Sequence, residues 1–273
     1  MAGDGSLLGA DGSLLGADGV SIQREGAILT LTLNRPERLN SLTTEVLDDL
    51  AELIEEAGAD EGVRVVVLTG AGRAFSAGAD LKSGEDSDKL PGIETLIAAN
   101  RVVRALRGIP QPTIAAVNGP AVGVGCSIAL GCDLVVASEK AYFLLSFTSI
   151  GLMPDGGATA LVPASIGRAR AMAMALVPER VPAAEALTSG LIYRVVPADS
   201  LAETVAALTE RLSTGAPLAL AAAKQAVNDA SLDQLEGALQ READGQAVLL
   251  ESADFFEAAV AFAEKRPPKF TGA

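Results

Sequence analysis

Three glycine-rich loops of this sequence contain the residues that could do chemistry. They cover residues 69–82, 118–125 and 151–157. The first two each follow a short apolar run, as expected of a buried strand, and each leads towards a helix. Such a turn leaves backbone N–H groups unpaired, and the helix N-terminus adds positive potential. Two such turns can direct two N–H groups at one oxygen atom, although either alone can also be a tight turn that lets helices pack.

The composition limits which side chains can assist. The chain has no histidine, which removes the Ser-His-Asp triad and most zinc sites. Acid–base chemistry near neutral pH therefore falls to Asp, Glu, Lys, Tyr or Cys. Cys126 and Cys132 lie six residues apart in one apolar stretch, a spacing that favours two reduced core cysteines over a metal or redox pair. The absence of a disulfide pattern favours a cytoplasmic protein.

The charge and hydrophobic patterning exclude two kinds of partner. A net charge of -14 argues against nucleic acid, whose phosphates need a basic surface. Local Lys and Arg residues could still hold an anionic ligand. No segment approaches ~18 uninterrupted apolar residues, and the N-terminus lacks the basic region of a secretion signal. We therefore expect no membrane partner.

The pattern of the elements that must position the loops predicts an α/β core followed by a helical C-terminal region. Residues 27–33 alternate apolar and polar side chains as a strand does, and 63–68 and 113–117 are typical of buried strands. A helix begins at Thr43 or Thr44. Other strands are expected near 133–137, 142–147 and 191–196, and helices after 118–125 and near 93–107, 167–177, 183–189, 199–213, 217–229, 232–249 and 252–265. Residues 1–19 contain DGSLLGA twice and predict a flexible arm.

Four segments in this order carry a family resemblance. They are FSAGADLK (75–82), AAVNGPAVG (115–123), CDLVVAS (132–138) and GLMPDGG (151–157). Together they resemble the crotonase superfamily of enoyl-CoA hydratases and isomerases, over about residues 20–270. Loops 34–40 and 264–270 also resemble that family. The combination is specific for the superfamily, but not for one reaction within it.

The resemblance implies a fold and a ligand. The fold would be a spiral of ββα units over residues 20–200, with a helical C-terminal trimerisation region over 201–273, assembled as a homotrimer or hexamer. The ligand would be an acyl-CoA thioester, so coenzyme A is part of the substrate, and neither a further cofactor nor a metal is implied. The thioester oxygen would accept hydrogen bonds from the backbone N–H groups of Ala79 and Val124. Neighbouring residues would line the substrate site: Leu39, Ala77, Gly78, Asp80, Leu81 and Gly123.

Two departures from the family pattern bear on the reaction. Hydratases of this family place glutamates where this sequence has Ser127 and Phe147. Hydration requires a group that holds and deprotonates water, and neither of these substrate-site residues can do this. Phe147 would also dry the pocket. An ordinary hydratase is therefore not expected.

One carboxylate, Asp155, remains in the matching region. It resembles the acidic residue that shuttles a proton between C2 and C4 in the isomerase branch, closest to the ring-epoxide isomerases of phenylacetate catabolism. The predicted reaction is therefore 3-enoyl-CoA to 2-enoyl-CoA, or ring-epoxide phenylacetyl-CoA to oxepin-CoA. Asp155 could instead be a helix cap or a turn residue. A non-catalytic acyl-CoA binder and a hydratase with atypical residues also stay open.

Cations are needed for the phosphates of coenzyme A. Lys82 and Arg38 lie beside the first loops of the resemblance. Lys265, together with Arg266 and Lys269, could reach the adenine end of a neighbouring subunit's ligand, with Phe262 under the base. Each of these can equally be a solvated surface charge.

Overall fold

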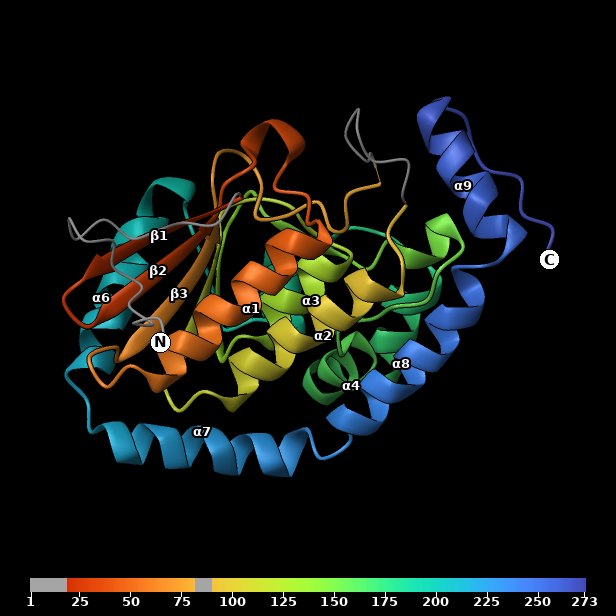
Figure 1. Ribbon diagram of the computed structural model, residues 1–273. Coiled ribbons are helices and arrows are strands. Elements are labelled where there is room, and N and C mark those ends of the chain that lie inside the picture. The colour runs from red at the N-terminus through yellow and green to blue at the C-terminus, as the bar shows by residue number, and fades with distance from the viewer. Residues whose placement is uncertain (1–18, 82–89) are drawn as a thin grey trace, which may run out of the picture.

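A six-stranded sheet forms the centre of the computed structural model, which describes residues 19–81 and 90–273 (Figure 1). The strand order is β1-β2-β3-β4-β6-β9. β1 and β2 form an antiparallel hairpin, and the later strands are added in parallel. The strands are β1 (Val20–Glu25), β2 (Ile28–Leu33), β3 (Val65–Gly70), β4 (Thr113–Val117), β6 (Leu134–Ser138) and β9 (Arg194–Val196). A second sheet contains β5 (Ala121–Val122), β7 (Tyr142–Leu144) and β8 (Val181–Pro182).

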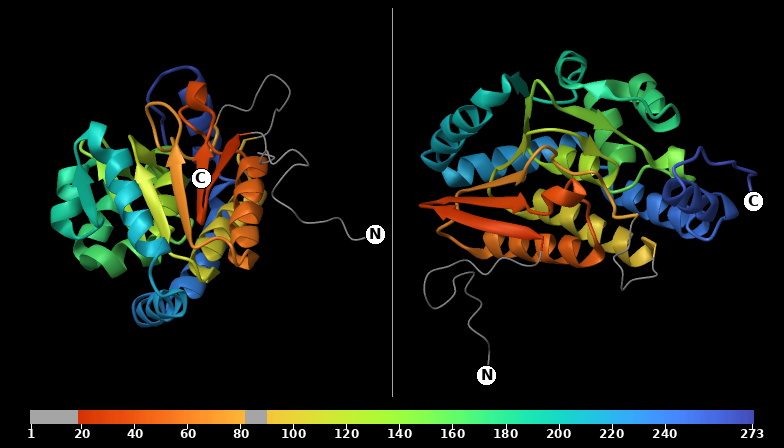
Figure 2. Two further views of the ribbon diagram at one scale, coloured as in Figure 1. Left: turned by 90° about the vertical axis from the view of Figure 1, so that its left-hand side faces the viewer. Right: turned by 90° about the horizontal axis from the view of Figure 1, so that it is seen from above.

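Helices cover both faces of the main sheet, because its parallel strands are apolar on both sides. On one face, Val66 and Leu68 of β3 join the large core beneath α1 (Thr44–Ala59), α2 (Ile93–Gly108) and α3 (Val124–Gly131). On the other face, Val65 and Val67 pack in a smaller core with α6 (Leu201–Ser213). Figure 2 shows the sheet between these two layers. α1 begins where the sequence predicts, since the Thr43 side chain accepts a hydrogen bond from the Val46 amide at 3.3 Å.

The chain after β7 is mostly helical. It forms η2 (Phe147–Ile150), α4 (Ala158–Leu176), α5 (Ala183–Ser189), η3 (Ala198–Ser200), α6, α7 (Pro217–Ser231), α8 (Leu235–Leu249) and α9 (Ala253–Ala263). α7 runs along the lower edge of the molecule in Figure 1, and α8 returns from its end towards α9. Within the described ranges, no helix has both the length and the apolar character that crossing a bilayer requires.

Most predicted elements are present, and the differences have physical reasons. β1 was not predicted: it lies at the edge of the described sheet, where it pairs with β2, and it lacks a continuous apolar run. The strand predicted over 142–147 ends at Leu144, and η2 follows. The helix predicted from 167 begins at Ala158 instead and is broken at Gly167, where φ is 75°. The arm predicted over residues 1–19 lies outside the described residues, except for Gly19.

A buried lysine attaches α7 to the core. The side chain of Lys224 is 6% exposed, and its Nζ lies 2.9 Å from Asp133 Oδ2. The same Nζ donates to the carbonyl oxygens of Leu106 at 2.8 Å and Gln111 at 3.0 Å. Burial lowers the pKa of Lys224, while the Asp133 carboxylate opposes that change. α7 contains no residue that is buried over its whole surface, so the ion pair and the two hydrogen bonds of the Lys224 side chain are specific contacts that join this helix to the core.

We predict that Lys224→Met destabilises the protein by roughly 3 kcal/mol, because it leaves the Asp133 carboxylate without its buried partner. The measurement is urea unfolding of both proteins at one fixed protein concentration. Lys140→Met is the matched control, since Lys140 is exposed. Identical urea midpoints for the two variants would show that the ion pair does not hold α7.

Candidate functional site

A cavity of about 740 Å³ opens where the first two glycine-rich loops meet the C-terminal helices. Its wall is drawn from η1 (Pro36–Arg38), both loops, η2, α8 and α9. It brings together most of the predicted site residues: Arg38, Leu39, Ala77, Gly78, Ala79, Asp80, Leu81, Gly123, Val124, Phe147, Asp155 and Phe262. These residues are far apart in the sequence, so the fold assembles one site from separate segments.

Two of the described residues that were predicted to bind substrate, Ser127 and Lys265, are not part of this wall. Ser127 is completely buried on α3, and its hydroxyl donates to the backbone carbonyl of Asp155 at 2.7 Å. The placement of Ser127 in the substrate site is thus corrected, because its side chain supports the Asp155 loop from behind. Lys265 is exposed beyond the end of α9 and does not line the cavity. Lys82 lies outside the described residues.

The two glycine-rich loops touch at Gly78 and Gly123. Both residues have positive φ values, 88° and 54°. A Cβ atom on Gly78 would lie 2.8 Å from the Val122 carbonyl oxygen, which is closer than a side chain can approach. The loops are also joined by a hydrogen bond from the Val122 amide to the Ser76 carbonyl, at 2.9 Å. Glycine at these positions is therefore what allows the backbones to meet.

Each loop presents a backbone amide beside this contact. Within the described part of the chain, neither the Ala79 nor the Val124 amide donates to a backbone carbonyl. Val124 is the first residue of α3, where an amide has no partner within the helix. Both residues line the cavity. Two donors are thus available to an oxygen atom bound there, as an oxyanion requires.

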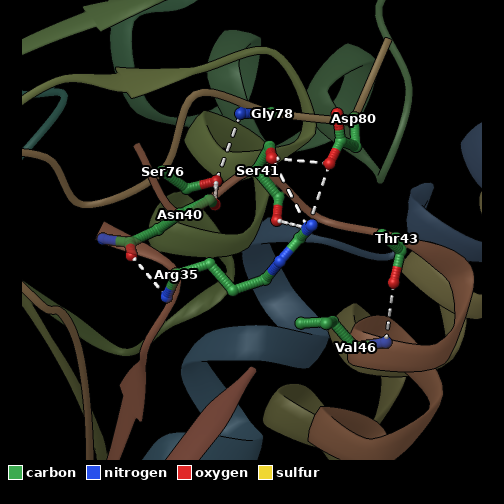
Figure 3. A network of polar contacts seen from close by, with 8 residues as sticks. All are labelled: Arg35, Asn40, Ser41, Thr43, Val46, Ser76, Gly78 and Asp80. Carbon is green, nitrogen blue, oxygen red and sulfur yellow. Dashed lines mark hydrogen bonds and ion pairs between the residues drawn. The ribbon is translucent and has the colours of Figure 1, made fainter. Parts of the chain in front are cut away.

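An ion pair holds the first loop from outside (Figure 3). Arg35 Nη1 lies 3.1 Å from Asp80 Oδ2 and donates to the Ser41 carbonyl oxygen at 2.8 Å. The Ser41 hydroxyl also donates to Asp80 Oδ2, at 2.9 Å. Asp80 lines the cavity, but these bonds direct its carboxylate into the protein. Its described contacts are therefore those of a loop support.

A second set of bonds in Figure 3 fixes the turn itself. The Ser76 hydroxyl accepts from the Gly78 amide at 3.1 Å and donates to the Asn40 carbonyl oxygen at 2.8 Å. The Asn40 side chain, which is buried, donates to the carbonyl oxygens of Ala71 and Ala74 at 2.9 and 2.8 Å. These protein contacts hold the described part of the loop, so the Ala79 amide takes its position from the fold.

Asp155 is a buried carboxyl group in the cavity wall. The residue is 9% exposed and lies between η2 and α4. Its Oδ2 accepts a hydrogen bond from Gln246 Nε2 at 2.7 Å, and its Oδ1 has no hydrogen-bond partner among the described residues. Burial raises the pKa of Asp155 to about 7; the Gln246 hydrogen bond opposes this, and the charge of Glu242 adds to it. Such a group can accept and return a proton near neutral pH.

Glu242 and Gln246 of α8 support the Asp155 loop, and neither was predicted from the sequence to be a site residue. Glu242 is completely buried and accepts bonds from the Gly157 amide at 2.7 Å and from the Thr159 amide at 2.9 Å. Its carboxylate thereby completes the N-terminus of α4. Glu242 and Gln246 continue the buried stripe of α8, which begins with Leu235, Ala238 and Leu239. Polar residues at apolar positions of a helical pattern were the signal that could have identified them.

Two positively charged residues, Arg38 and Arg73, line the cavity. The Arg266 side chain pairs with Glu257 and Glu264 of its own chain, so the adenine-end role predicted for it would compete with these bonds. Among the described residues, no three acidic, cysteine or histidine side chains lie close enough together to hold a metal ion.

Comparison with known proteins gives consistent matches over nearly the whole chain. The family model described as enoyl-CoA hydratase/isomerase matches residues 23–273. The 1,2-epoxyphenylacetyl-CoA isomerase of Escherichia coli is 42% identical over 252 residues, which cover 91% of this chain and 96% of that protein. A probable enoyl-CoA hydratase of Rhodobacter capsulatus is 40% identical over 247 residues, covering 90% and 95%. The crystal structure of an enoyl-CoA hydratase from Mycobacterium avium subsp. paratuberculosis matches with a TM-score of 0.87 and 50% identity, covering 93% and 98%.

We predict that Asp155→Asn stabilises the protein at about pH 8 but not at about pH 4. Because the pKa of Asp155 is raised when folded, the folded wild type binds more protons than the unfolded chain between ~4 and ~7 and loses stability as pH rises through that window. The Asp155→Asn variant does not lose stability in this way, because asparagine does not ionise. Urea unfolding at several pH values measures the difference, with the exposed Asp199→Asn as control. A pH-independent difference would contradict the raised pKa.

Proposed function

Because the chain belongs to the enoyl-CoA hydratase/isomerase family, we propose that it is an acyl-CoA isomerase that moves a double bond with Asp155 as its acid–base group. The family match and the solved relatives confirm the predicted crotonase superfamily and its α/β fold. The observation that carries the finer proposal is the buried Asp155 carboxyl in the cavity wall, with a pKa of about 7. A Cβ on the next residue, Gly156, would lie 3.4 Å from Val124 Cγ2, so the Asp155 loop passes close to the residue that carries the second amide.

The proposed reaction uses two kinds of group. Asp155 removes a proton from C2 of a 3-enoyl-CoA, and the electron pair spreads onto the thioester oxygen as a dienolate. The N–H groups of Ala79 and Val124 stabilise that oxygen. The protonated Asp155 then returns the proton to C4, which leaves the 2-enoyl thioester. One carboxyl group suffices because the same proton is taken up and returned. Phe147 and Leu152 line the cavity and would keep water from the intermediate.

Two features favour isomerisation over hydration. Hydration needs a group that activates water, but Ser127 is occupied with the Asp155 carbonyl and Phe147 has no polar group. The similarity to the 1,2-epoxyphenylacetyl-CoA isomerase supports ring-epoxide phenylacetyl-CoA as a second substrate form. Relatives named as hydratases keep a hydratase with atypical residues as the alternative, beside a non-catalytic acyl-CoA binder.

The ligand proposal also concerns coenzyme A. We propose that coenzyme A enters only as part of the substrate, with Arg38 among the residues that meet its phosphates. Phe262 lines the cavity from α9 and offers an aromatic ring to the acyl-CoA. We propose that Lys82 binds the coenzyme A phosphates in its own chain. We propose that Lys265 reaches the adenine end of the ligand in a neighbouring subunit.

We predict that Asp155→Asn lowers the isomerisation rate by ~10²–10⁴-fold, the usual contribution of general acid–base catalysis. Acyl-CoA affinity should stay near the wild-type value, because the amide has almost the same size. The assay follows conversion of a 3-enoyl-CoA to the conjugated thioester by ultraviolet absorbance, with ligand binding measured in parallel.

Three other results would point elsewhere. Equal rates in both proteins would remove Asp155 as the base. Tight binding without turnover in either protein would support the non-catalytic binder. Hydration of crotonyl-CoA at ~10 s⁻¹ or faster, which is typical of a good enzyme, would support the hydratase.

We also propose that the C-terminal helices assemble the protein as a trimer or a hexamer. Several large apolar side chains of this region are exposed in the single chain, among them Leu218, Val248 and Phe256 at 85%, 71% and 54%. Exposed apolar side chains on neighbouring helices mark surfaces that bind protein. Light scattering at micromolar concentration should give three or six times the chain mass, and Phe256→Glu should reduce it. A monomeric wild type would contradict the proposal.

A further inference from the structure

Gln246 is held in one orientation above the Asp155 loop. It is 1% exposed and lies on α8. Its Oε1 accepts from the Met153 amide at 3.3 Å, and its Nε2 donates to the Met153 carbonyl oxygen at 3.0 Å. These two bonds to one residue determine which end of the side-chain amide is the NH₂ group. The same Nε2 donates to Asp155 Oδ2 at 2.7 Å.

This orientation makes the two oxygens of Asp155 unequal. Oδ2 faces an NH₂ group, which has no lone pair to accept a hydrogen bond. The C=O oxygen of a protonated carboxyl group accepts a hydrogen bond better than its OH oxygen does, so the Gln246 bond favours Oδ2 as the C=O oxygen. Oδ1 has no hydrogen-bond partner among the described residues. A proton bound to Asp155 is therefore favoured on Oδ1.

We propose that Gln246 is a positioning residue for the isomerisation: it makes Oδ1 of Asp155 the oxygen that exchanges protons with the substrate and keeps that buried carboxyl group able to act as a base. The inference rests on the proposed function, in which Asp155 shuttles the proton. It extends the active site into α8, a helix that the sequence suggested only for assembly. Gln246 itself lines the cavity, but it acts through Asp155.

The electrostatic surroundings of Asp155 agree with this role. Burial raises its pKa, the Gln246 hydrogen bond lowers it, and the Glu242 carboxylate raises it. Among the described residues around the loop, α3 presents Ser127, which binds the Asp155 carbonyl, and η2 presents Phe147, and both are uncharged. A Cβ on Gly151 would lie 3.1 Å from the Asp254 carbonyl carbon of α9, and the Asp254 carboxylate binds the amides of Thr271 and Gly272. Gln246 is therefore the group that offsets burial.

The test compares Gln246→Met with Gln240→Met. Methionine has the length of glutamine but donates no hydrogen bond, and Gln240 is on the exposed side of the same helix, where it binds Asp244. We expect the midpoint of the acidic limb of the isomerisation rate to rise by about one pH unit in Gln246→Met, because a hydrogen bond to the charged form is lost. Gln240→Met should leave it unchanged. A merely structural role would lower the rate equally at every pH.

A second variant and a second measurement keep the test decisive. Gln246→Glu retains an acceptor for the Met153 amide but places a carboxylate beside Oδ2, so the pair must share a proton and the midpoint should rise further. Carbon-13 NMR of the Asp155 carboxyl group, assigned with Asp155→Asn, follows the same titration without turnover. If the wild type does not isomerise, the proposed function fails, while the NMR titration still decides the role of Gln246. An Asp155 titration unchanged in both Gln246 variants would overturn the inference.

Discussion

The close approach of two backbones at Gly78 and Gly123 is the constraint on which the rest of the site depends. It is possible because β3 and β4 are neighbouring parallel strands, so the loops that follow them leave the same edge of the sheet. A Cβ on Gly78 would collide with the Val122 carbonyl oxygen, and Gly123 has a positive φ of 54°, which side chains rarely adopt. The Arg35–Asp80 pair and the Asn40 side chain then hold the first loop in place. The amides of Ala79 and Val124 thus take their positions from the sheet, and their preorganisation requires no ligand.

The part of the site around Asp155 is completed by the C-terminal helices. It contains buried carboxyl groups, whose burial costs folding free energy. Asp155 and Glu242 are both buried carboxyl groups whose pKa values are raised by burial. Glu242 is compensated by the amides at the start of α4 and by the Thr159 hydroxyl. Asp155 has one hydrogen bond and one unpartnered oxygen. The structural carboxylate is thus satisfied, whereas the carboxyl group that lines the cavity has one oxygen without a partner among the described residues, as the proposed proton exchange requires.

Local pattern was enough to predict β2, β3, β4 and β6, the loops and α1, because the cap at Thr43 and the apolar spacing of such elements act within a few residues. The same reasoning placed Ser127 wrongly, since position in a motif does not show that its hydroxyl turns to the Asp155 carbonyl. β1 was missed because an edge strand lacks a continuous apolar run. The early start of α4 was missed because its N-terminus is completed by Glu242, 85 residues away from Gly157. A contact of that range leaves no signal in the sequence around α4.

The carboxyl groups at the cavity differ in whether they can transfer a proton, and this difference limits the reactions that the site can catalyse. Glu37 is exposed on η1, and the carboxylate of Asp80 is bound to Arg35 and Ser41. Glu242 is not part of the wall, and its carboxylate accepts bonds from the start of α4. Asp155 is the buried carboxyl group of the wall, and its Oδ1 has no hydrogen-bond partner among the described residues. A single buried carboxyl group favours chemistry in which a proton leaves one carbon and returns to another, because no second group is needed to activate water. The fold common to the hydratases and isomerases would then supply the enolate, and the side chains around Asp155 would decide what becomes of it.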